Sequence, residues 1–196
     1  MTRLSAILSL FLIGSLLRAA EPVPYLDDPG KLLPADTAWV GRLETRLAAF
    51  ERTTEIKIVL RLHPKSPSAE EDNEPGAYMR GLATKLGVGW RGVFVVYFAD
   101  DPDWRVWIGD ELVSLFVGKA GTAKEFTESG AMHEAKEVFL KAAFAKADVV
   151  FAARPDGTPA QRLAGRADAL VDGLIDRLTP RSRDNRPISS QPVRKQ

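Results

Sequence analysis

The stretch GVGWRGVFVVYFADDPDWRVWIGDEL, residues 87–112, decides the fold of this chain. It holds the uninterrupted apolar run VFVVYFA, the acidic turn DDPD and the segment WRVWI. A run that is apolar on both faces is typical of an interior strand, and a short Asp/Pro turn before a second strand indicates an antiparallel hairpin. The carboxylates of this hairpin either carry chemistry or form a solvated turn.

The residues before this stretch predict one more strand and two helices. Apolar side chains recur at helical spacing from Asp36 to about residue 54, and EIKIVLRL (55–62) alternates like a half-buried strand. A second helix over about 77–86, which buries Tyr78, Leu82 and Leu86 and ends at Gly87, leads to the hairpin. Two strands joined through a loop and a helix are expected to pair in parallel, by a right-handed crossover.

The residues after the hairpin predict helices only. Helical segments are expected at 111–116, 132–146 and 160–178, and His63 is expected in the loop after the first strand. Helices therefore outnumber the few strands and can cover both faces of their sheet. The sequence predicts the α/β class, as a three-layer α/β/α sandwich with a small mixed β-sheet flanked by helices on both faces.

The two ends of the chain differ from the body in composition. Arg3, fourteen apolar or small residues and a small-residue exit near Ala20 are typical of a secretory signal peptide; the alternative is an uncleaved anchor, although a spanning helix needs about 20 apolar residues. The last sixteen residues carry five basic residues and one acid, which predicts a disordered tail. We expect a signal peptide at 1–20, one domain at 21–180 and a disordered basic tail at 181–196.

The charge of the body excludes one class of partner. Residues 21–180 carry 20 basic and 25 acidic residues, whereas nucleic-acid binding needs clustered Lys and Arg on the fold. No nucleic acid is therefore expected as a partner, and the basic tail is expected to make at most a peripheral contact with a membrane. The chain has no Cys, so disulfides and thiol chemistry are absent.

The acidic turn is the main candidate for chemistry. An apolar strand followed by Asp100–Asp103 is similar to the nucleophile strand of haloacid-dehalogenase phosphatases, but Trp104 begins another strand at once, which favours a hairpin turn. A Ca²⁺ ion takes about six to eight oxygen ligands, so acids from other segments must join the turn. The candidate metal ligands are Asp28, Asp103 and Asp110, for Ca²⁺ or Mg²⁺. The alternative is that these acids only form and solvate turns.

The order of these elements resembles the TPM domain family over about residues 25–117. The resemblance rests on Asp28 with Leu32-Leu33, the strand TTEIKIVL, the loop and strand LGVGWRGVFVVYFA, Asp103 with Trp104-Arg105, and Gly109 with Glu111. It implies an exported domain of the kind that occurs in photosystem repair proteins, receptor accessory proteins and bacterial envelope proteins.

The resemblance also implies two alternative functions. Some members of the family are phosphatases and some bind divalent cations, but this chain has Trp90 and Arg91 where the family has an acid and an amide. Arginine supplies no oxygen ligand, so we expect an interaction or assembly module of a membrane or envelope protein complex, located in the periplasm or secreted. The alternative is a divalent-metal-dependent phosphatase for phosphomonoesters that uses Asp28, Asp103 and Asp110.

Overall fold

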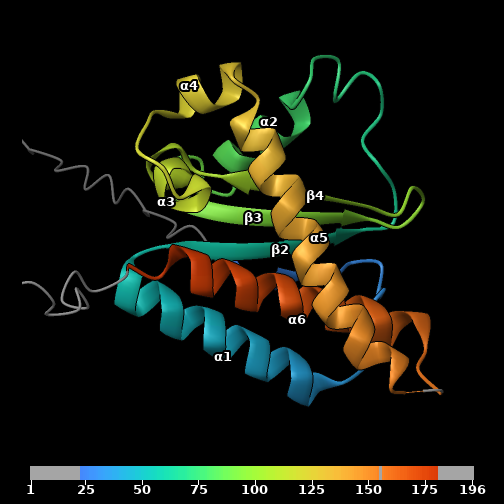
Figure 1. Cartoon of the computed structure of the whole chain (residues 1–196). Helices are drawn as coiled ribbons and strands as arrows, with labels where there is room; N and C mark the ends of the chain where they lie inside the picture. The colour runs from blue at the N-terminus through green and yellow to red at the C-terminus, as the bar shows by residue number, and fades with distance from the viewer. Residues whose placement is uncertain (1–22, 155, 181–196) are drawn as a thin grey trace, which may run out of the picture.

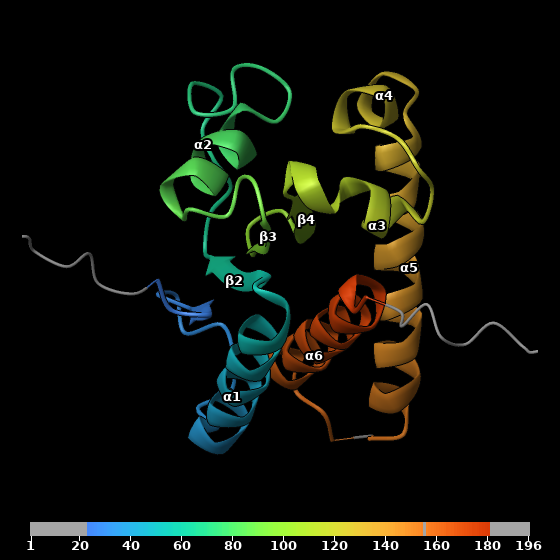
Figure 2. The ribbon, with the colours of Figure 1, turned by 90° about the vertical axis from the view of Figure 1, so that its left-hand side faces the viewer.

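The computed structural model describes residues 23–154 and 156–180, so the predicted signal peptide and the predicted basic tail lie outside the described residues. Four strands form one open sheet in the order β1-β2-β3-β4 (Figure 1). Their bounds are Leu26–Asp27 (β1), Lys57–His63 (β2), Gly92–Phe98 (β3) and Asp103–Ile108 (β4). The sheet lies between α2 (Ala77–Lys85) on one side and α1 (Thr37–Thr54) with α6 (Pro159–Leu178) on the other, as Figure 2 shows. The predicted α/β class is confirmed.

The pairing of the strands follows the predicted crossover and hairpin. Strands β2 and β3 are parallel, with Lys57 opposite Gly92 and His63 opposite Phe98. Strand β4 returns antiparallel to β3, so that Asp103 lies opposite Phe98. The short strand β1 was not predicted, and it pairs in parallel with β2. Two residues are too few to show a strand period, which is why the sequence pattern missed it.

Helix α1 begins and ends at residues with clear local causes. The Asp36 carboxylate accepts the Trp39 N–H at 3.0 Å and caps the helix, and Glu55, in the left-handed conformation, ends it. Between these ends Leu43 and Leu47 are buried one turn apart, which turns one apolar face of the helix toward the sheet.

The sheet separates two layers of core. On one face, Ile58 and Val95 belong to a core shared with α1 and α6; on the other face, Val59 and Phe94 pack with Met79 of α2. Both faces of β2 are therefore covered, and the prediction of a half-buried strand is wrong.

The side chains that are buried in β2 and α2 differ from those that the sequence pattern predicts. Arg61 is only 6% exposed, because its guanidinium donates to the carbonyls of Pro24 and Leu60. Helix α2 directs Met79 and Ala83 most deeply into the core, whereas the predicted residues Tyr78, Leu82 and Leu86 are only partly buried against it.

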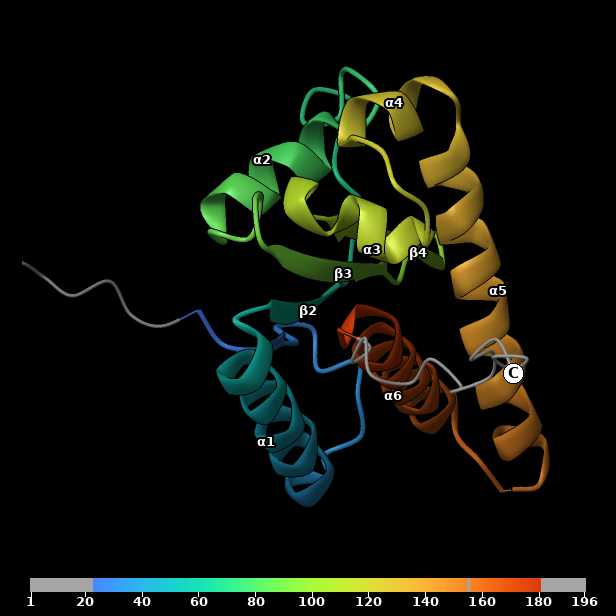
Figure 3. The ribbon, with the colours of Figure 1, turned by 60° about the vertical axis from the view of Figure 1, so that its left-hand side comes forward.

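The chain after β4 adds helices to the α1/α6 side of the sheet and to its β4 edge (Figure 3). They are the 3₁₀ turn η1 (Asp110–Leu112), α3 (Val113–Val117), α4 (Ala123–Glu128) and α5 (Ala131–Ala152), which packs along α6. Helix α4 was not predicted, and α5 runs to Ala152 instead of residue 146. No helix within the described ranges is long and apolar enough to cross a membrane.

Candidate functional site

The three predicted metal ligands lie at two opposite ends of the sheet. Asp28 follows β1 and Asp103 begins β4 opposite the last residue of β3, so both lie where the parallel strands end. Asp110 follows β4 at the other end. A strand rises about 3.3 Å per residue, which separates Asp103 from Asp110 by roughly 20 Å. Because Ca²⁺ binds oxygens at about 2.3–2.6 Å, one ion cannot bind both carboxylates.

The carboxylate of Asp28 has a structural role instead. Its two oxygens accept the N–H groups of Leu32 and Leu33 at 2.9 and 2.8 Å, and they hold the turn between β1 and α1, in which Lys31 has a φ of +51°. Over residues 23–154 and 156–180 no three His, Cys, Asp or Glu side chains form a group that could hold a metal ion. In these ranges, the three predicted ligands therefore do not share one site for Ca²⁺ or Mg²⁺. The phosphatase alternative, which needs such a site, gains no support from this arrangement.

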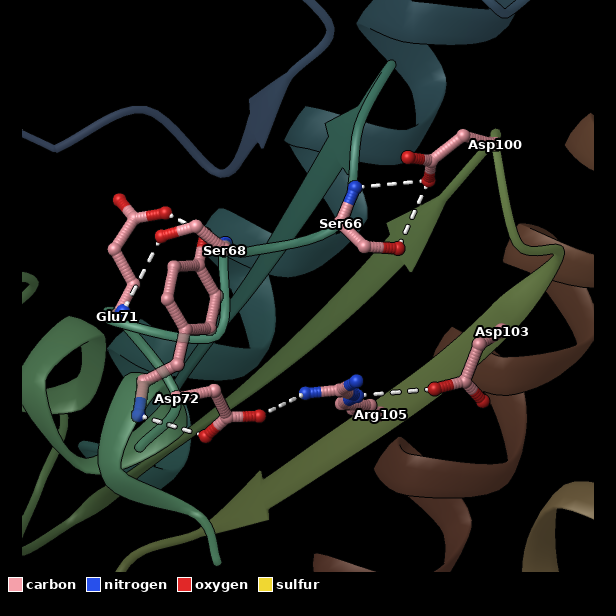
Figure 4. A network of polar contacts seen from close by, with 8 residues as sticks. Ser66, Ser68, Glu71, Asp72, Asp100, Asp103 and Arg105 are labelled. Atoms are coloured by element: carbon pink, nitrogen blue, oxygen red, sulfur yellow. Dashed lines mark hydrogen bonds and ion pairs between the residues drawn. The ribbon is translucent and has the colours of Figure 1, made fainter. Parts of the chain in front are cut away.

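The acids of the hairpin turn bind the loop that follows β2. The Asp100 carboxylate accepts hydrogen bonds from both the N–H and the hydroxyl of Ser66 at 2.8 Å (Figure 4). It also accepts the Asp101 N–H at 2.9 Å. The hydrogen bonds from Ser66 hold the pKa of Asp100 below its ordinary value. Asp100 thus stays ionised and fastens one loop to the other.

A second ionic contact closes the same edge of the sheet. The Arg105 guanidinium donates to Asp103 at 3.0 Å and to Asp72 at 2.8 Å (Figure 4), and it lies 5.0 Å from the centre of the Phe98 ring. Asp72 also accepts the Tyr78 N–H at 3.2 Å, in the first turn of α2. The carboxylates of Asp72, Asp100 and Asp103 are thus paired with a cation or hydrogen-bonded, and they do not converge on a ligand.

His63 lies at the end of β2, and the prediction that it belongs to a loop is wrong. Its ring stacks on Phe98 with centroids 5.9 Å apart, and its buried Nε2 has no hydrogen-bond partner among the described residues. Burial lowers the pKa of His63. The Ser66 hydroxyl donates to Asp100 rather than to His63, so these residues do not form the hydrogen-bonded nucleophile and base of a hydrolase.

The opposite end of the sheet presents an exposed aromatic side chain. Trp90, in the loop before β3, is 67% exposed. Arg91 forms an ion pair with Glu111 and donates to the carbonyl of Thr54, the last residue of α1, at 3.0 Å. Glu111 is one of the acids that carried the resemblance, and its partner is an arginine.

Backbone contacts hold the Trp90 loop against the turn after β4. The Glu111 N–H donates to the Trp90 carbonyl at 3.1 Å, and the Gly109 N–H donates to the Gly92 carbonyl at 2.8 Å. A Cβ on Gly109 would lie 2.4 Å from the Trp90 carbonyl oxygen. Glycine is required there because two backbone segments touch, which explains the Gly109–Glu111 pattern without a ligand.

The Trp90 loop could have been recognised in the sequence as an exposed site. Trp90 stands between glycines and outside the apolar period of the neighbouring helix and strand, which is unusual for a core side chain. The sequence pattern identified Trp90 and Arg91 only as departures from the family. It gave no sign that Arg91 pairs with Glu111, since twenty residues separate them.

Comparison with known proteins shows no family. No family model matches the chain, and a search of curated proteins finds no relative. Among solved structures, the chain is similar to the N-terminal domain of a protein from P. gingivalis, determined by solution NMR, with 19% identity and a TM-score of 0.49. The match covers 81% of this chain and 87% of that one. The resemblance to the TPM domain is not confirmed and stays a prediction.

Proposed function

We propose that this chain is an exported, TPM-like interaction module that binds a protein partner in a membrane or envelope complex. The Trp90 surface, defined as Trp90, Arg91, Asp110 and Glu111, is the proposed contact. The observation that carries the proposal is the 67% exposure of Trp90 on a loop that backbone hydrogen bonds fix to the turn after β4. Export rests on the signal peptide predicted from residues 1–20.

Exposure of a tryptophan on a fixed loop favours binding for two physical reasons. Tryptophan is enriched among the residues that dominate interface energies, because its large ring removes much apolar surface from water. Association also costs free energy when a mobile loop must be ordered. That cost is reduced here, because the Trp90 carbonyl already accepts the Glu111 N–H at 3.1 Å.

The polar residues of the Trp90 surface suit the rim of an interface. The ion pair between Arg91 and Glu111 lies beside the ring, and the two side chains are 40% and 38% exposed. Partly exposed charges of this kind contribute mainly to orientation and to the choice of partner. Their arrangement suits a protein surface that offers an apolar pocket with polar groups around it.

The proposal is tested by placing a photo-activated cross-linking residue at position 90 in cells, identifying the captured protein, and measuring its affinity for purified chains. Truncation of a central anchor weakens binding by about 2 kcal/mol or more, so Trp90→Ala is expected to raise the Kd at least about thirtyfold. Val149, which is 73% exposed on α5, provides the control: Val149→Ala is expected to bind like the wild type. Equal affinities for wild type and Trp90→Ala would refute the proposal.

A further inference from the structure

A pocket of about 470 Å³ is lined by residues near the amino ends of α1 and α6 and the carboxyl end of α5. These helix ends lie at the lower right of Figure 1. Its volume falls within the range of about 300–1,000 Å³ that is usual for small-molecule sites. Small or apolar side chains from the three helices line it, among them Trp39, Ala147, Phe151 and Ala164. The small residues of α5 and α6 leave the space that a ligand could fill.

The acids that line this pocket are already engaged. The Asp168 carboxylate accepts the Trp39 indole N–H at 2.5 Å and an Arg46 N–H at 2.8 Å. Asp172 forms an ion pair with the same arginine at 3.0 Å. Asp36 accepts the Trp39 backbone N–H as the cap of α1. Arg46 therefore offsets one of the three negative charges of the lining.

The cations that line the pocket are not engaged in this way. Arg42, Lys146 and Arg154 belong to the lining, and none of them forms an ion pair with a carboxylate of the described residues. Counting Arg46, four cations face the three carboxylates of the lining, so the pocket combines an apolar floor with a net positive charge.

We propose that this pocket, the α1–α5–α6 pocket, binds an anionic amphiphile with an alkyl or acyl body and a carboxylate or phosphate head. The apolar body lies on the floor formed by Trp39, Ala147 and Ala164, and the head lies near Arg42 and Lys146. An uncharged amphiphile would cover the apolar floor but would form no ion pair with the cations. Inorganic phosphate would pair with the cations but would leave the apolar floor exposed to water. Only a ligand with both parts complements the whole lining.

Isothermal titration of the full chain, purified as its host processes it, tests this proposal with four probes below their micelle concentrations. The probes are laurate, dodecyl phosphate, the uncharged dodecyl maltoside, and inorganic phosphate. We expect laurate or dodecyl phosphate to bind with one-to-one stoichiometry and at least tenfold more tightly than the other two probes. Whichever of laurate and dodecyl phosphate binds with the lower Kd shows whether the pocket prefers a carboxylate or a phosphate head group. A neutral amphiphile or free phosphate that binds as tightly as both anionic amphiphiles would overturn the proposal.

Filling the pocket provides the matched structural test. Gly165 lines the pocket on α6, and a Cβ there has no neighbour within 4 Å, as is also true of Gly81 in α2, outside the pocket. Gly165→Leu is expected to weaken binding of the preferred probe at least tenfold, whereas Gly81→Leu leaves it unchanged. Circular dichroism checks that both variants are folded. If Gly165→Leu and Gly81→Leu bind the preferred probe with equal affinity, the probe does not bind in the α1–α5–α6 pocket.

Removing single charges tests the head-group contact. Lys146→Gln and Arg42→Gln are each expected to weaken binding of the anionic probe about fivefold to tenfold, while Lys119→Gln, on a residue outside the pocket lining, serves as the control. Trp90→Ala is expected to keep full affinity for the probe, so this proposal and the proposed partner surface can fail separately. Retention of wild-type affinity in both pocket variants would overturn the assigned head-group position.

Discussion

Replacement of Gly109 by alanine tests whether close packing requires glycine at the end of β4. A Cβ at this position would lie 2.4 Å from the Trp90 carbonyl oxygen, 2.7 Å from the Trp90 carbonyl carbon and 2.9 Å from the Gly92 carbonyl oxygen. All three atoms belong to the backbone, so no side chain can rotate away. The loop that carries Trp90 must move away from β4 instead.

The size of the effect follows from these contacts. Overpacking in a close-packed region costs about 1–3 kcal/mol. The movement also stretches the 2.8 Å hydrogen bond from the Gly109 N–H to the Gly92 carbonyl, which contributes about 1 kcal/mol. We expect Gly109→Ala to lower the free energy of unfolding by about 3 kcal/mol, which corresponds to roughly 6–12 °C in Tm for a chain of this size.

Urea unfolding followed by tryptophan fluorescence measures this change, and Gly89→Ala is the matched control. Gly89 belongs to the same loop and has open space around a Cβ, so its replacement is expected to change stability by less than about 0.5 kcal/mol. If both variants unfold at the same urea concentration, the packing explanation of Gly109 is refuted. A glycine kept for a ligand would then be the better explanation.

Three further predictions concern the carboxyl end of the sheet. Asp28→Ala removes the acceptor of two N–H groups and is expected to cost about 1–2 kcal/mol of stability, equally in Ca²⁺, Mg²⁺ or EDTA; a loss that depends on metal in thermal unfolding would contradict the structural role of Asp28. Burial lowers the pKa of His63 in the fold, so its contribution is complete above the unfolded pKa of about 6.5 and declines as the pH falls toward the folded pKa. His63→Gln should therefore flatten the dependence of stability on pH below about 6.5, and parallel curves for the two proteins would disprove this. Asp100→Ala removes the acceptor of the Ser66 N–H and is expected to speed hydrogen exchange of that amide at least about fivefold, a change of about 1 kcal/mol; unchanged exchange would show that the contact contributes nothing.

Local patterns in the sequence predicted most of the sheet, because strand and helix periods are local properties. The run VFVVYFA predicted the covered strand β3, whose residues 93–96 are fully buried. The prediction failed for β2, since the guanidinium of Arg61 is satisfied by carbonyls of Pro24 and Leu60. Only the tertiary structure supplies the Pro24 contact, so the sequence pattern alone, with a charged residue in an alternating strand, predicts exposure.

Two other misses have different causes. Helix α4 carried a readable signal, because Thr122 and Glu125 form a capping box at its start, a spacing that is typical of a helix N-terminus. Arg42 of α1, Lys146 of α5 and Arg154, just after α5, line one pocket although α1 and α5 are far apart in the chain. No spacing rule predicts that meeting, and it follows only from the packing of α5 on α6 and of both near α1.

The predicted metal set could have been rejected from the sequence. Asp103 and Asp110 flank the segment that the sequence itself predicted to be a strand, and the two ends of a six-residue strand lie about 20 Å apart. Spacing in the chain suggested a cluster of acids, whereas the expected secondary structure already separated them.

The two proposed contacts lie at opposite ends of one helix. Arg91 donates to the carbonyl of Thr54, which places the carboxyl end of α1 beside the Trp90 surface, whereas Asp36 and Trp39, at its amino end, line the α1–α5–α6 pocket. An 18-residue helix spans about 27 Å at 1.5 Å per residue. A small amphiphile in the pocket cannot reach a partner protein at Trp90 across that distance. Both can therefore bind at once.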